Sequence, residues 1–82
     1  MENATFTLLV PFAPIGEPWV VRRARTVVET FDSREDALAG ARALAMGLAR
    51  RMGTSVRVRT QDAKGAWCTL YDTRNAMSRQ SA

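Results

Sequence analysis

The chain has 82 residues, of which 46% are apolar and 24% are charged, and it carries a formal net charge of +4. This length allows one domain, and the composition is that of a folded globular protein. A single cysteine, Cys68, and no histidine exclude an internal disulfide and argue against a zinc site or a histidine-activated nucleophile. We therefore expect a cytoplasmic binding protein that is not an enzyme, with no metal, no cofactor and no contact with a membrane.

Arginine supplies almost all of the positive charge, since Lys64 is the only lysine in the chain. The planar guanidinium group suits phosphates and carboxylates. Nucleic acid or an acidic protein surface is therefore the expected class of partner. A genome that prefers arginine codons explains the same composition, and both interpretations stay open.

Alternating and β-branched segments predict five strands, at residues 5–10, 19–23, 26–31, 55–61 and 66–71. In the first of these strands, Phe6, Leu8 and Val10 share one face. Little separates the second strand from the third, so we expect a hairpin that turns at residues 24–25. A turn at residues 62–65 joins the last two strands into a second hairpin.

The segment between Asp32 and Gly53 has the pattern of an amphipathic helix. Asp32 or Ser33 caps it, since each has an acid three residues later, and Gly53 supplies the usual stop. One apolar stripe recurs at helical spacing and consists of Leu38, Ala41, Leu44, Ala45, Leu48 and Met52. We expect an α+β fold, an antiparallel sheet (N-terminal strand plus ββαββ) with one helix packed on one face. The domain is expected to span residues 1–72, with a flexible tail at residues 73–82.

The order of certain core and turn residues carries a resemblance. In chain order they are Trp19 and Val21, Phe31, the helix from Glu35 to Ala45, Val56 and Val58, Asp62 with Gly65, and Trp67. This arrangement resembles a family of short, uncharacterised bacterial and phage domains, over residues 19–71. The resemblance implies a fold and no catalytic residue, and the N-terminal strand and the short first hairpin depart from the family. In size and element order the chain is also similar to small phage anti-CRISPR proteins.

Alternation in the last two strands divides their side chains between the two faces of the sheet. It places Val56, Val58 and Leu70 against the helix, with Cys68 beside them as a small buried side chain. The opposite face is then expected to carry Arg57, Arg59, Trp67, Thr69 and Tyr71, joined by Arg22 from the first hairpin. Arginines beside aromatic rings are typical of single-stranded nucleic-acid binding, through phosphate pairing and base stacking. The alternative is that Trp67 is a core residue and that the arginines only keep this face soluble.

The outer side of the helix gives a second candidate surface. Opposite the apolar stripe lie small residues and one methionine, namely Ala39, Ala43, Met46 and Gly47. Such a surface suits the close approach of a partner protein or of a second copy of the chain. The high helix propensity of alanine explains the pattern equally well.

Two hypotheses for function follow from these two surfaces. The first is a non-catalytic domain whose arginine and aromatic side chains contact nucleic acid or a nucleoprotein complex. The second is a small protein-binding inhibitor or adaptor, phage-encoded and anti-CRISPR-like, that docks through the helix face or a strand edge. A homodimer of purely structural purpose is a third alternative.

Overall fold

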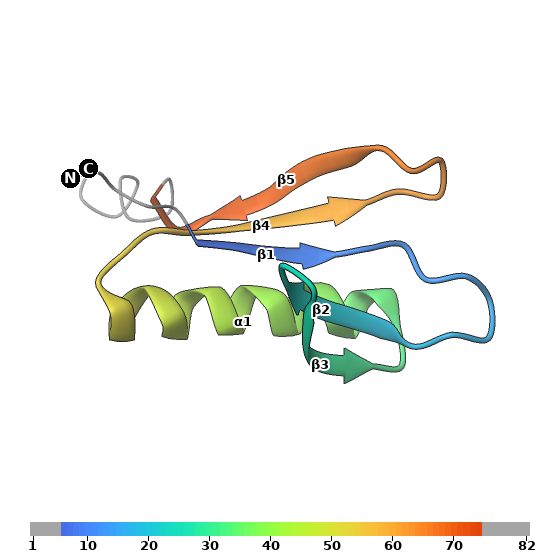
Figure 1. Ribbon diagram of the computed structural model, residues 1–82, viewed down its shortest axis with the longest axis horizontal. Coiled ribbons are helices and arrows are strands. Elements are labelled where there is room, and N and C mark those ends of the chain that lie inside the picture. Colours follow the sequence, from blue (N-terminus) through green and yellow to red (C-terminus); the bar gives the residue numbers. More distant parts are fainter. Residues whose placement is uncertain (1–5, 75–82) are drawn as a thin grey trace.

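Residues 6–74, which the computed structural model describes, form a five-stranded sheet with one helix packed on one face (Figure 1). The elements in chain order are β1 (Phe6–Val10), β2 (Trp19–Arg23), β3 (Thr26–Phe31), α1 (Arg34–Met52), β4 (Val56–Gln61) and β5 (Trp67–Asp72). In the sheet the strands lie in the order β3-β2-β1-β4-β5. The predicted α+β fold is therefore confirmed.

The sheet is mostly antiparallel, as predicted, but it contains one parallel pair of strands. At its centre β1 and β4 are parallel neighbours, with Leu8 opposite Val58, whereas all other neighbouring pairs are antiparallel. The parallel pair arises because α1 carries the chain from β3, at one edge, past β2 and β1 to β4. A helical crossover of this kind lets the next strand run parallel, whereas the short turns of the two hairpins reverse the chain.

The core lies between α1 and the side of β1, β2 and β4 that faces it. Its fully buried apolar side chains are Leu8, Val10, Val21, Val56 and Val58 from the strands and Ala37, Ala41 and Ala45 from α1. The deepest helix positions are alanines, so the bulkier residues of the predicted stripe flank the contact. Leu38, Leu44 and Leu48 are accordingly only partly buried. Met52 is 52% exposed, which corrects its predicted place in the stripe.

Both ends of α1 are capped as the sequence predicts. The Ser33 hydroxyl accepts a hydrogen bond from the Asp36 backbone N–H at 3.1 Å, which satisfies one of the free donors of the first turn. At the other end Gly53 has a left-handed backbone, with a φ of 65°, and its N–H donates to the Ala49 carbonyl. Of the two candidate caps, Asp32 and Ser33, the helix uses Ser33.

The two hairpin turns also lie where they were predicted. Ala24 and Arg25 form the first, and Ala24 has a φ of 55°, a left-handed conformation that alanine rarely adopts. In the second turn the Asp62 carboxylate accepts hydrogen bonds from the backbone N–H groups of Lys64 at 2.9 Å and Ala66 at 3.0 Å. This side chain therefore holds the second turn, whereas the first has no residue type that marks it in the sequence.

The packed part of the chain extends to Thr73, one residue beyond the predicted end of the domain. Thr73 is 1% exposed, and its hydroxyl oxygen accepts a hydrogen bond from the Val56 backbone N–H at 2.9 Å. Residues 75–82 of the predicted tail lie outside the described residues.

Thr73→Val keeps the shape of this side chain and removes its acceptor. Because the buried Val56 N–H then loses its partner, we expect the free energy of unfolding to fall by about 1–3 kcal/mol. Urea denaturation measures the change, and Thr69→Val, at an exposed position on β5, is the matched control. Equal stabilities of the two variants would mean that the hydrogen bond contributes nothing.

Candidate nucleic-acid interface

The side of the sheet turned away from α1, which we call the open face, carries a row of side chains that crosses four strands. Arg22 of β2 and Arg59 of β4 both lie opposite Leu9 of β1. Thr69 of β5 continues the row beyond Arg59. Val58, the neighbour of Arg59 in β4, is fully buried under α1, so strand alternation turns the row to the opposite side.

Two guanidinium groups therefore flank one leucine. Neighbouring strands lie about 4.8 Å apart, which puts the backbones of Arg22 and Arg59 about 10 Å from each other. The Nε atoms of both arginines are buried without a hydrogen-bond partner, and neither side chain forms an ion pair among residues 6–74. Burying an unpaired donor on a charged group is costly. An anion held between the two side chains would compensate their charge and accept hydrogen bonds from the guanidinium groups.

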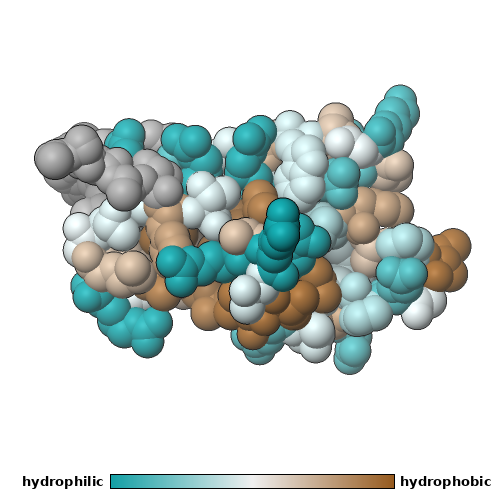
Figure 2. Space-filling view, in the orientation of Figure 1, coloured by the Kyte–Doolittle hydropathy of each residue, from teal (hydrophilic) through white to brown (hydrophobic). Residues whose placement is uncertain are grey.

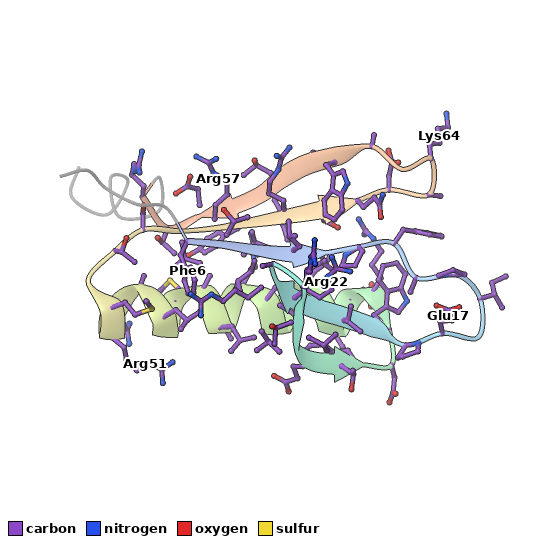
Figure 3. The ribbon with its side chains drawn as sticks, in the orientation of Figure 1. Phe6, Glu17, Arg22, Arg51, Arg57 and Lys64 are labelled. Carbon is purple, nitrogen blue, oxygen red and sulfur yellow. The ribbon has the colours of Figure 1, made fainter. Side chains whose placement is uncertain are left out.

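Arg57 lies on the open face as well, but a carboxylate compensates its charge. Its Nε donates a hydrogen bond to Oδ2 of Asp72 at 3.3 Å, and the two residues lie directly opposite each other in β4 and β5. Figure 3 shows Arg57 toward the end of the sheet where β4 begins, and Arg22 nearer the middle. Arg57 thus has the predicted orientation, but it offers less free charge than Arg22.

Trp67 provides an exposed aromatic ring on the open face. It is the first residue of β5, lies opposite Gln61 and is 39% exposed. This exposure excludes the alternative in which Trp67 is a core residue. Gln61 follows Arg59 by two residues, so the ring lies one step of about 7 Å along the strands from the arginine row. The ring and the arginine row therefore share one surface.

Tyr71 does not lie on the open face, which corrects its predicted place beside the arginines. The pairing of β4 with β5 shifts after Val58 and leaves Leu70 as an extra residue, a β-bulge that changes the alternation of β5. Tyr71 therefore lies opposite Val58 on the helix side, where its hydroxyl donates a hydrogen bond to Sδ of Met46 at 2.9 Å. The Arg42 guanidinium lies 5.1 Å from the centroid of its ring.

Cys68 is exposed, which corrects the prediction that it is buried. It lies opposite Thr60, a buried residue on the helix side, as the alternation predicts. However, β5 is an edge strand, and α1 packs along the other strands of the sheet (Figure 1). The face of Cys68 was therefore predicted correctly, but its burial was not.

The four residues predicted as a protein interface on α1 are all exposed but do not form one surface. Met46 lies toward β5, where it accepts the hydrogen bond from Tyr71. Ala43 and Gly47 line a groove on the opposite side of the helix, against β3. Ala39 does not line this groove.

Residues 6–74 contain no group of three histidine, cysteine, aspartate or glutamate side chains placed to hold a metal ion. No helix among them is long and apolar enough to cross a membrane. Comparisons with protein-family models, with curated proteins and with solved structures found no significant match to this chain.

Proposed function

We propose that this chain is a non-catalytic, cytoplasmic domain that binds single-stranded nucleic acid on its open face. The observation that carries the proposal is the pair of arginines, Arg22 and Arg59, which flank Leu9 on the open face and form no ion pair among residues 6–74. The net charge of +4 adds a general attraction for polyanions.

In the proposed complex a backbone phosphate lies over Leu9 and accepts hydrogen bonds from both guanidinium groups. The planar fork of each arginine suits phosphate oxygens. A neighbouring base stacks on the exposed ring of Trp67, and such stacking contributes about 1–3 kcal/mol per base without selecting a sequence. Single strands are favoured because their bases are free to leave the stack and meet an aromatic ring.

Arg22→Glu combined with Arg59→Glu is expected to weaken binding of a labelled single-stranded oligonucleotide by about tenfold or more, because two phosphate contacts are lost. Because the pair holds one phosphate, the plot of log affinity against log salt concentration should become shallower by about 0.7. Fluorescence anisotropy titrations at several salt concentrations measure both quantities.

Arg25→Glu combined with Arg34→Glu is the matched control, since both residues are exposed, neither belongs to the row and the net charge changes equally. This control should keep most of the affinity and the salt dependence, and circular dichroism checks that both variants fold. An equal loss in the two variants would indicate attraction by overall charge and reject a site at the row. A wild type that binds no oligonucleotide even at low salt would reject nucleic acid as the partner.

A further inference from the structure

A second surface, separate from the open face, lies along the side of α1 that borders β3. Phe31 of β3 and residues of α1 line an open and mostly apolar groove of about 600 Å³ there. The apolar helix residues that line it are Gly40, Ala43, Leu44, Gly47 and Leu48. We name this surface the α1–β3 groove.

The groove exists because the β2–β3 hairpin covers only part of α1. In Figure 1 the hairpin lies beside the half of α1 where the helix begins, and the other half extends beyond it. Figure 2 shows hydrophobic surface gathered in the lower middle of the view, where the hairpin crosses the helix. The groove therefore leaves a strip of small and apolar side chains of α1 uncovered beside β3.

Charged residues of opposite sign line the two ends of the groove. Glu29 lines it from β3, whereas Arg50 and Arg51 line it from the last turn of α1. Figure 3 shows Arg51 at that end of the helix, pointing away from the sheet. None of the three forms an ion pair among residues 6–74. An apolar centre with an acid at one end and two bases at the other is complementary to a copy of itself turned by a two-fold rotation.

We propose that the occupant of the α1–β3 groove is a second copy of this chain, related by a two-fold axis through the centre of the groove. The rotation brings Glu29 of each copy to the partner's Arg50 and Arg51 and packs the two apolar centres together. Gly47 allows close contact there, because nothing lies within 4 Å of the position that a Cβ would take. The core of an 82-residue domain is small, so the added apolar contact also stabilises the fold.

Gly47→Glu tests this interface without disturbing the folded monomer. The added side chain meets open space in the monomer, and glutamate forms helix more readily than glycine. In the dimer its carboxylate would be buried in the apolar centre without a partner, so dimerisation should be lost. Sedimentation velocity at matched concentrations is expected to show a dimer for the wild type and a monomer for this variant. Ala39→Glu, at an exposed helix position outside the groove, is the matched control and should remain dimeric.

Charge reversal tests the pairing of the two ends. Glu29→Arg alone, or Arg50→Glu with Arg51→Glu, places like charges together at both ends of the interface, so each variant should be monomeric. An equimolar mixture of the two variants restores opposite charges at both ends. The mixed dimer should therefore form about tenfold more tightly, or better, than either variant with itself.

Recovery in the mixture also shows that both variants are folded, because unfolded chains would not regain a specific pairing. A wild type that sediments as a monomer would overturn the proposal. So would a dimer that Gly47→Glu leaves as intact as the Ala39→Glu control does. These outcomes are independent of nucleic-acid binding, which the variants of the open face test.

Discussion

Leu8→Ala is expected to lower the free energy of unfolding by about 3–5 kcal/mol. Leu8 is 1% exposed and belongs to β1, the central strand of the sheet. Truncation removes buried methyl groups and leaves a cavity that the surrounding strands and helix close only in part. Total stabilities of small domains are about 5–15 kcal/mol, so a loss of this size should lower the melting temperature strongly or prevent folding.

Leu9→Ala is the matched control, because Leu9 is the next residue of β1 and is only partly buried, on the open face. Its truncation opens no enclosed cavity and is expected to cost about 1 kcal/mol. Urea denaturation followed by circular dichroism compares the two variants. If Leu9→Ala lowered the free energy of unfolding more than Leu8→Ala, the core would lie on the side of the sheet that carries Leu9, which would contradict the fold.

The second large effect is a difference in sign between two glycines of α1. A Cβ on Gly40 would lie 2.3 Å from Cζ of the Phe31 ring, whereas a Cβ on Gly47 would meet nothing within 4 Å. Gly40→Ala must therefore displace the ring, and overpacking of this kind costs about 1–3 kcal/mol, more than the gain in helix propensity. Gly47→Ala instead meets no obstacle and should stabilise the helix by about 1 kcal/mol.

Thermal melts at low protein concentration, where the chain is monomeric, measure both changes. In a domain of this size 1 kcal/mol corresponds to about 4–8 °C, so the Gly47 variant should melt above the wild type and the Gly40 variant below it. Phe31→Leu in the Gly40→Ala background removes the end of the ring and should recover part of the loss. If Gly40→Ala were as stabilising as Gly47→Ala, the ring would not pack over Gly40.

Most of the secondary structure could be predicted from the sequence, because periodicity and local turn chemistry determine it. Ser33 and Gly53 mark the two ends of α1 by their own hydrogen bonding and backbone conformation. The parallel pairing of β1 with β4 could not be predicted in this way. Alternation shows which face a side chain takes, but it does not show which strand lies beside which.

The same limit applies to the candidate site. Alternation predicted the faces of Arg59 and Trp67 correctly, but it failed at Tyr71, because the bulge at Leu70 has no glycine or proline to mark it. The row that joins Arg22 to Arg59 depends on β1 lying between β2 and β4. That order follows from the crossover of α1, so the alignment of Arg22 with Arg59 could not be predicted from the sequence.

An NMR titration of the isotope-labelled chain with a short single-stranded oligonucleotide tests most directly whether the open face binds nucleic acid. The two tryptophans give separate indole N–H signals. Trp67 is exposed on the open face, whereas Trp19 packs against the core and against Phe12, with ring centroids 5.5 Å apart. We predict that the indole signal of Trp67 and the backbone signals of Leu9 and Arg59 shift on titration, whereas the indole signal of Trp19 does not. A saturating titration that leaves Trp67 and Leu9 unchanged, or that shifts only residues of the α1–β3 groove, would contradict the proposal.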